Sequence, residues 1–437
     1  MPRLGMSERG RLLPMDVACS RLVPAVQVPR PTHRAGWSQP LCSGLLAVPV
    51  VRHLARPRTL SRARVQLRAG RSCEPLLRWL KDLPDVEGLD KLRIRQSAYA
   101  DGGLGVFAAR SFEAGELVCK VPSQALLMPG GDADAESLAT ALLQEYQDAD
   151  SRFQPYFQSL PDKIDLAPLH PLLWPKELQQ AEYLAELFDG SALAHHIFSA
   201  RLNRRGASAD EMWALAVVDS RSFNLATADG EAVRALVPFI DLFNNFLPLS
   251  SGASSWNCVF RGTIESGALL QAECPVQEGE ELVHLYDELS TAALWATYGF
   301  VPEEDIDNPF EAPLITVPLN KEQRRLKLDL EDRHWLDEQT LGFEIPWDAE
   351  EGGPLLPALC QLQNESLHAA SRQLQAQELL RQRLEETLAC SLRSEERLLQ
   401  PASEPHAAFK ARLQRAARRL LRNERPLLED ELSFMDS

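Results

Sequence analysis

The chain has 437 residues, a formal net charge of −16 and 45% hydrophobic residues. This length allows a large buried core and predicts two or three domains. The acidic balance makes nucleic acid an unfavourable partner, because phosphate binding needs a basic face, and it would attract basic protein substrates instead. We expect a soluble monomer that binds neither nucleic acid nor membrane.

Residues 1–73 differ sharply from the rest of the chain. They contain thirteen arginines, no lysine and only Glu8 and Asp16 as acids, for +11, so the remainder carries −27. This composition predicts an organellar transit peptide. Eight prolines disfavour one long amphipathic helix and favour the plastid stroma over the mitochondrion or cytoplasm. A disordered basic leader or an upstream false start codon stays open. The apolar run 41–51 is too short to span a bilayer.

The eight cysteines are scattered, with no Cys-x-x-Cys motif and no cysteine–histidine cluster. This spacing supports neither a zinc site nor a disulfide framework, so we expect no metal.

Folded structure is expected to begin near Glu74, where PLLRWLKDL predicts a short amphipathic helix. Residues 92–128 alternate between β-rich runs and glycine turns, which predicts three or four short strands. From about 132 to 220 the apolar pattern is helical, interrupted by FQPYFQSLP at 153–161. Strands are expected again around 234–286.

The C-terminal region begins after Asp307, and its acidic linker DAEEGGP at 348–354 precedes two helical stripes. The first consists of leucines spaced by four, and both predict helix-to-helix packing. We therefore predict an α+β fold: a β-rich domain over 74–309, split by a helical insertion, and an all-helical domain over 310–437. The residues of the stripes are Leu380, Leu384, Leu388 and Leu392, then Phe409, Leu413, Ala417 and Leu420.

Two segments next to expected strands offer contacts to a ligand. One is rich in glycine and has a flexible backbone, and the other contains a charged arginine. Gly102-Gly103-Leu104-Gly105 lacks the spacing of a dinucleotide fingerprint. It would let a ligand approach the backbone, but taken alone a tight turn is the simpler explanation. Arg221 in DSRSF would bind a carboxylate in bidentate fashion if it lies beside a pocket, and is a surface residue otherwise.

The stretch from Asp241 to Tyr286 carries the strongest chemical signal. Asn244 and Asn245 in DLFNNF offer amides that donate and accept, although an Asx turn would use them too. Tyr286 ends the GEELVHLY segment, and Tyr298 follows twelve residues later. A tyrosine at a strand end can orient a nucleophile and attract a cation, or it can simply belong to the core.

Five segments in this order resemble the SET-domain methyltransferases of the Rubisco large-subunit lysine methyltransferase type, over about residues 76–310. The C-terminal tail is similar to the substrate-binding domain of that family by pattern only. The segments are GGLGVFAARSFEAGELVCKVP, SRFQPYFQSLP, DSRSF, LVPFIDLFNN and GEELVHLYDELSTAALWATYGFVPEEDIDNP.

The resemblance implies S-adenosylmethionine as the cofactor and N-methylation of a protein lysine as the reaction. It implies a catalytic role for Tyr286 and a substrate channel lined by Tyr298, Phe223 and Phe300. The residues that it assigns to the cofactor are Gly102, Leu104, Arg221, Asp241, Asn244 and Asn245.

One position departs from the family, which normally has Asn-His where this chain has Asn244-Asn245. The alternatives are a histidine N-methyltransferase and a non-catalytic SET scaffold, and Asn245 keeps the second open. His284 has the same strand parity as Tyr286, so a pocket role competes with a core or solvated position.

Overall fold

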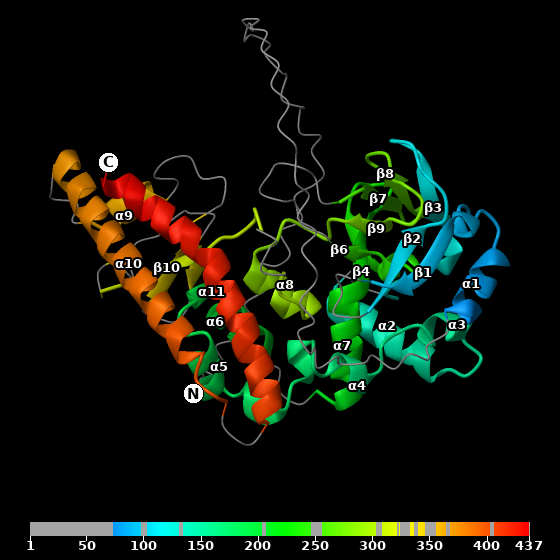
Figure 1. The fold of residues 1–437 in the computed structure, drawn as a ribbon, viewed down its shortest axis with the longest axis horizontal. Helices are drawn as coiled ribbons and strands as arrows, with labels where there is room; N and C mark the ends of the chain where they lie inside the picture. Colours follow the sequence, from blue (N-terminus) through cyan, green and yellow to red (C-terminus); the bar gives the residue numbers. More distant parts are fainter. Residues whose placement is uncertain are drawn as a thin grey trace, which may run out of the picture. The chain divides into compact units, whose positions relative to one another are not determined.

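The computed structural model describes twelve parts of one unit, Leu67–Ser437 (Figure 1). The expected leader over 1–73, the apolar run 41–51, Gly102 and the linker 348–354 lie outside the described residues, apart from Cys73. The described parts are 73–97, 103–130, 134–202, 207–245, 256–302, 308–320, 323, 333–335, 340–345, 355–363, 368–402 and 406–436. Within these parts, no helix has the length and apolar character needed to cross a membrane.

The first elements follow the sequence prediction. Helix α1 (Glu74–Lys81) buries Leu76 and Leu80, and the hairpin of β1 (Leu92–Gln96) and β2 (Leu104–Ala108) is antiparallel. Strand β3 (Leu117–Val121) follows after a turn in which Gly115 has a φ of 83°, a value that favours glycine.

The insertion is helical, as predicted, and each long helix begins at a local capping signal. The Asp134 side chain accepts from Ser137 N at 2.7 Å at the start of α2, and Ser208 and Glu211 form a capping box on α7. The segment 153–161 holds a single helical turn, α3. The helices are α2 (Ala135–Gln147), α3 (Gln154–Phe157), α4 (Lys163–Leu166), α5 (Ala181–Leu187), α6 (Ala192–Leu202) and α7 (Ala209–Arg221).

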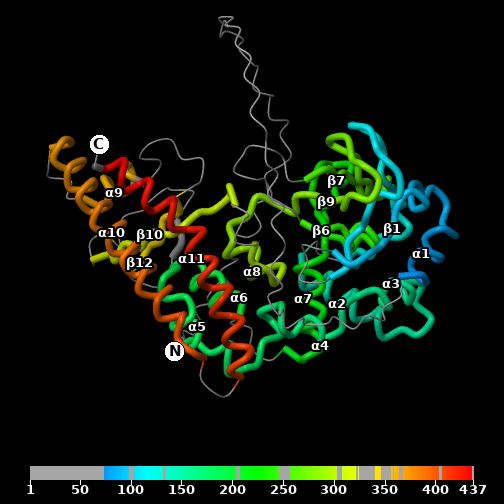
Figure 2. The backbone as a smooth tube through the Cα atoms, viewed as in Figure 1, coloured from blue at the N-terminus to red at the C-terminus, as the bar shows by residue number. Residues whose placement is uncertain are grey.

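The main sheet has nine strands and is centred on β9 (Glu281–His284). Its path is β1-β2-β9-β7-β4-β5, while β8 pairs with both β3 and β7. Figure 2 shows β1, β6, β7 and β9 gathered in one part of the molecule. The two-residue strand β6 (Asn244–Asn245) lies parallel to β9, with Asn245 opposite His284. The remaining strands are β4 (Ser222–Ala226), β5 (Ala232–Leu236), β7 (Cys258–Thr263) and β8 (Gly267–Ala272).

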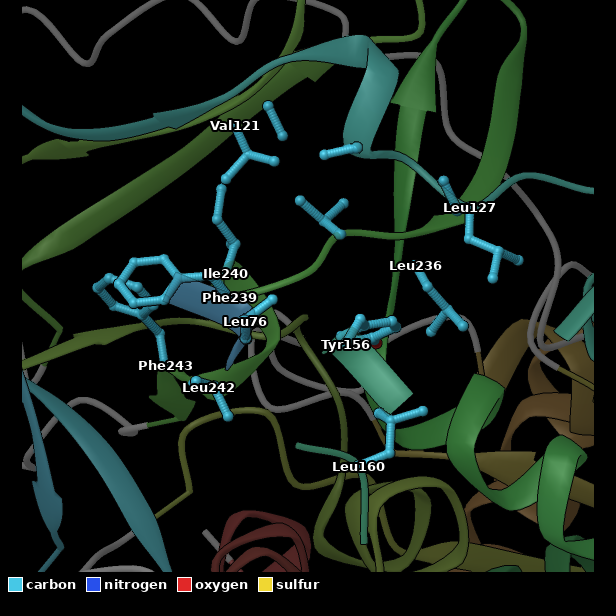
Figure 3. Packing of buried hydrophobic residues seen from close by; sticks show 14 of the residues in the cluster. Leu76, Val121, Leu127, Tyr156, Leu160, Leu236, Phe239, Ile240, Leu242 and Phe243 are labelled. Atoms are coloured by element: carbon cyan, nitrogen blue, oxygen red, sulfur yellow. The ribbon is translucent and has the colours of Figure 1, made fainter. Parts of the chain in front are cut away.

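The turn between β5 and β6 is buried and strained. Phe239 has φ 76° and ψ −44°, a conformation that costs a bulky residue about 1–3 kcal/mol, and only 1% of it is exposed. Figure 3 shows Phe239, Ile240 and Phe243 packed together on this turn, with Tyr156 in the same core. The packing of these rings holds the turn that leads into β6.

Helix α8 (Thr291–Tyr298) carries one of the predicted site residues at its last position. The Ser290 side chain caps it by accepting from Ala293 N at 3.3 Å, and Gly299 ends it with a φ of 80°. His170 Nε2 bonds the carbonyl of Thr297 at 2.9 Å, which fixes the last turn.

The C-terminal region is not all-helical, in contrast to the prediction. It contains a three-stranded antiparallel sheet in the order β10-β12-β11; LITVP has three consecutive β-branched residues, and TLGFE contains a threonine and a phenylalanine, residue types that favour strands. The rest is helical, so the α+β class is confirmed. Leu380 and Leu384 are buried as predicted, but Leu392 is 47% exposed. The elements are β10 (Leu314–Pro318), β11 (Arg333–Trp335), β12 (Thr340–Glu344), α9 (Leu355–Gln361), α10 (Ala369–Arg397) and α11 (Ala407–Asp436).

A buried polar cluster connects α8 to α11. Glu311 Oε1 accepts from Thr291 N at 3.0 Å and from Asn308 Nδ2 at 3.0 Å, and the Thr291 hydroxyl also donates to it. Asn423 of α11 in turn donates to Thr291 Oγ1 at 3.1 Å. Only 2% of Glu311 is exposed, and this burial raises its pKa to about 7. Its ionisation therefore opposes folding near neutral pH.

We predict that Glu311→Gln stabilises the protein more at pH 8 than at pH 5.5. The folded-state pKa lies above the ordinary glutamate value, so the stability contributed by the protonated carboxyl is lost as the pH rises through 7. Glutamine keeps the Oε1 acceptor without the charge. Calorimetric melting should show a gain in Tm roughly 2–5 °C larger at pH 8. Exposed Glu278→Gln is the control, and an equal gain at both pH values would contradict the prediction.

Candidate active site

Tyr286 lies two residues beyond the end of β9, and both its backbone and its hydroxyl group form hydrogen bonds. Its backbone N donates to Asn245 Oδ1 at 2.9 Å, and its hydroxyl donates to the carbonyl of Phe243 at 3.0 Å. Burial raises the pKa of Tyr286 to about 12, so the phenol is neutral at physiological pH. Because its proton is directed to Phe243, the phenol oxygen keeps lone pairs that can accept from a substrate.

Asn244 and Asn245 use their side chains to fasten the short strand β6 to its neighbours. Asn244 Nδ2 donates to Leu104 O at 3.1 Å and to Glu281 Oε1 at 2.7 Å, which joins β6 to β2 and β9. Asn245 Nδ2 is buried without a hydrogen-bond partner, although the Oδ1 of the same amide is used by Tyr286. A buried donor of this kind favours a ligand acceptor beside it.

The predicted glycine turn does approach this site closely. Gly105 lies against β9, where a Cβ would stand 2.1 Å from Glu281 Oε1 and 2.9 Å from Asn244 Nδ2. Ser97 Oγ donates to the other oxygen of Glu281 at 2.8 Å. Leu104 beside it is 39% exposed. Gly102 lies outside the described residues, so its predicted role stays a prediction.

Arg221, at the end of α7, forms a buried pair with Asp241. Its NH1 donates to Asp241 Oδ2 at 3.1 Å and to the Asp241 carbonyl at 3.0 Å, and Tyr156 OH donates to the same Oδ2 at 3.0 Å. The Arg221 side chain is 22% exposed and that of Asp241 is fully buried. Burial raises the pKa of Asp241, while Arg221 and Tyr156 oppose the rise. The buried Asp241 carboxylate thus positions Arg221, and its predicted place in the cofactor pocket stays a prediction.

The other predicted site residues belong to one continuous row of rings. Tyr286 and Tyr298 have centroids 4.7 Å apart, and Phe300 lies 6.4 Å beyond Tyr298. On the other side, His284 lies 5.1 Å from Tyr286 and stacks on Phe223 at 5.7 Å. Phe223 therefore reaches Tyr286 only through His284, whereas Tyr298 contacts it directly. The row combines residues from β4, β9 and α8.

His284 is a core residue of this row, with 2% of its surface exposed. Burial lowers its pKa to about 4, so the ring is neutral at pH 7. Its Nδ1 lies 3.1 Å from the Leu285 carbonyl, and its Nε2 is buried without a hydrogen-bond partner. His284 is therefore placed beside the site but does not carry a charge into it.

These features fit together as a recognised fold. The structure superposes on the SET domain of LSMT bound to lysine and AdoHcy with a TM-score of 0.54 and 17% identity, covering 83% of this chain and 92% of that one. For Rubisco LSMT bound to AdoMet the TM-score is 0.51, with 16% identity and 83% and 93% coverage. This chain has a SET fold.

Sequence comparison finds similarity over about half of the chain. Human N-lysine methyltransferase SETD6 is 25% identical over 261 residues, which is 49% of this chain and 52% of that protein. Protein SET DOMAIN GROUP 40 of Arabidopsis thaliana is 23% identical over 305 residues, or 56% and 61%. The chain thus spans about half to three fifths of the curated relatives it matches. No protein-family model matches the sequence.

Three residues that sequence reasoning did not assign support the SET site. Tyr156 holds Asp241, and Glu281 holds Asn244 and Ser97. Asn257 pairs with β9 through its side chain, donating to Glu281 O and accepting from Val283 N, both at 2.9 Å. Tyr156 and Glu281 lie within the quoted motifs, but only the long-range contacts give them a role. Among the described residues, no group of three or more His, Cys, Asp or Glu side chains is arranged to hold a metal ion.

We predict that Gly105→Ala destabilises the fold by about 1–3 kcal/mol, because the new methyl group would displace Glu281 and Asn244 from their hydrogen bonds. Urea titration of the purified protein measures the change in the free energy of unfolding. Gly130→Ala is the matched control, since nothing lies within 4 Å of the added methyl group. Equal unfolding midpoints for the two variants would show that the contact is not tight.

Proposed function

We propose that this protein is an S-adenosylmethionine-dependent protein-lysine N-methyltransferase. The observation that carries the proposal is the neutral Tyr286 hydroxyl, held by Phe243 next to the ring of Tyr298 and beside the amides of β6. The SET fold supports it, as do the lysine, AdoHcy and AdoMet bound in the similar structures. Residues 310–437 would then bind the substrate protein, as the similarity of the C-terminal region to the substrate-binding domain of the Rubisco large-subunit lysine methyltransferase family implies.

The residues around β6 suit the proposed cofactor, which supplies an electrophilic methyl group on a sulfonium when bound. The buried Asn245 Nδ2 needs an acceptor, and the exposed Leu104 offers an edge for close approach. Asn244 would keep that edge fixed. Arg221 would hold the carboxylate of the cofactor with the part of its guanidinium that Asp241 leaves exposed.

The chain's own residues then have to prepare the amine. Only a neutral amine has the lone pair, and deprotonating a lysine of pKa near 10.4 at pH 7 costs roughly 4–5 kcal/mol. The rings of Tyr286, Tyr298 and Phe300 exclude water, and desolvation lowers the pKa of the target ammonium. The Tyr286 oxygen would accept an N–H of the amine and so aim its lone pair.

Asparagine at position 245 is compatible with activity. Its Oδ1 accepts from the backbone N of Tyr286, so the side chain itself contributes to the placement of the tyrosine. This favours an enzyme over a non-catalytic scaffold. A histidine target stays the alternative within the same fold, because imidazole needs far less help to lose a proton.

The function is tested by incubating the protein, without residues 1–73, with radiolabelled S-adenosylmethionine and an organellar extract. We expect one or a few labelled proteins, and mass spectrometry of the labelled peptides would identify the modified residue. Detection of methyl-histidine in the labelled peptides would show that the substrate residue is histidine and not lysine. Binding of the cofactor without any labelling would favour the scaffold.

We predict that Tyr286→Phe lowers the rate of methyl transfer at least tenfold and leaves S-adenosylmethionine affinity nearly unchanged, because the acceptor for the amine is removed together with the hydrogen bond to the Phe243 carbonyl, while the ring stays in place. Single-turnover labelling gives the rate and calorimetry gives the affinity. Tyr183→Phe removes a buried hydroxyl without a partner and serves as the control. Wild-type turnover in Tyr286→Phe would overturn its assignment.

Arg221→Ala is expected to weaken S-adenosylmethionine binding by at least tenfold, because a bidentate partner of a carboxylate is lost. The variant also leaves Asp241 without its cation, so Arg221→Lys, which keeps the charge, is measured beside it. Arg110→Ala, at an exposed ion pair, is the control. An unchanged calorimetric affinity in both Arg221 variants would remove this residue from the pocket.

We also propose a plastid location, supported by the arginine-rich, proline-containing composition of residues 1–73. A fluorescent protein carrying these residues should enter the plastid stroma when expressed in plant cells. Import into mitochondria, or retention in the cytoplasm, would contradict this.

A further inference from the structure

A groove on the helical insertion lies away from the proposed methyl-transfer site. It has a volume of about 410 Å³ and is formed by α2, α4 and the first turn of α7. Trp213 in this turn and Arg221 at the end of α7 are about 12 Å apart along the helix axis. The groove therefore belongs to a different surface from the tyrosine row.

The floor of the groove is aromatic and rigid. Tyr146 and Trp213 have ring centroids 4.8 Å apart, and Phe157 lies 5.5 Å from Tyr146. Trp213 is 4% exposed, and its Nε1 donates to the carbonyl of Pro161 at 2.9 Å, which fixes the indole. These rings are already in place for a ligand, so binding would need little ordering of the protein.

Two large hydrophobic side chains remain in solvent at this groove. Ile164 is 79% exposed and Tyr146 is 48% exposed, and both line it. A single exposed apolar residue needs no explanation, but two in one groove beside fixed aromatic rings are typical of an interaction site.

The rim of the groove is acidic. Asp162 and Asp210 line it, and exposed Asp148 and Glu211 follow lining residues directly in the chain. Lys163 also lines the groove, but it is paired with Asp210. The fixed charge of these five groups is therefore negative, which complements a basic ligand with an apolar side chain.

We propose that this groove docks a lysine- or arginine-rich protein segment through an aliphatic anchor. Ile164, Tyr146 and Trp213 cover the anchor, and the aspartates around them attract the flanking cations. The site binds a partner segment at a place other than the methyl-transfer site, so its binding is independent of catalysis. Affinity is expected to fall with added salt, because the charged rim is exposed.

The test uses fluorescence anisotropy with the full chain and a labelled twelve-residue peptide of alternating lysine and leucine. Three peptides of the same length serve as probes: this one, one with glutamate in place of lysine, and one with serine in place of leucine. We expect saturable binding of the lysine–leucine peptide only. Equal binding of the glutamate peptide, or of the serine peptide, would overturn the proposal.

Two variants locate the binding. Ile164→Ser should weaken the lysine–leucine peptide roughly tenfold, since burial of an aliphatic side chain contributes about that factor. Asp210→Lys should weaken it by a similar factor and reduce its salt dependence. Leu374→Ser, at a 66% exposed leucine of α10, is the matched control. Binding that is equally affected by Leu374→Ser, or unaffected by Ile164→Ser, would place the peptide elsewhere. None of these measurements requires methyl transfer. A negative result would therefore contradict the docking groove without contradicting the proposed enzyme activity.

Discussion

The whole site depends on how two asparagines fasten a two-residue strand to β9. A parallel pairing this short contributes little by itself, because few backbone hydrogen bonds are formed. Side-chain amides supply what the backbone lacks: Asn244 joins β2 and β9, while Asn245 accepts from the backbone of Tyr286. Asn257 adds the same kind of support from the other side of β9. Polar side chains that replace missing ladder bonds thus determine where the tyrosine lies.

Burial then sets the electrostatic character of the centre. It keeps Tyr286 and His284 neutral at physiological pH, through a raised pKa in the first and a lowered pKa in the second. Arg221 interacts electrostatically with Tyr286 and keeps part of its side chain exposed, and the buried Asp241 is paired with it. The centre therefore combines an uncharged aromatic wall with one anchored cation at its border. Such a division suits a ligand that has a carboxylate at one end and reacts at the other.

Sequence patterns predicted the strands of 92–128, the helical insertion and the α+β class, because apolar periodicity and glycine turns act locally. They also selected Tyr286, Tyr298 and Arg221, which the fold brings to one region. They missed the sheet at β10–β12, whose strands are short and lie close to helical stripes. They could not assign Tyr156 or Glu281 a role, since each acts on a partner far away in the chain. The complete burial of the Asp241 carboxylate and its pairing with Arg221 are likewise features that residue spacing does not reveal.

The sequence separations of these contacts have a consequence for folding kinetics. Asn244 contacts Leu104 across 140 residues, Tyr156 contacts Asp241 across 85, and Tyr286 contacts Phe243 across 43. Closing such long loops costs entropy before any contact compensates for it, so these bonds should form late on the folding pathway. A partly folded chain would then have its helices and hairpins but no assembled centre. Incompletely folded chains would therefore be inactive, because their site residues would not yet lie together.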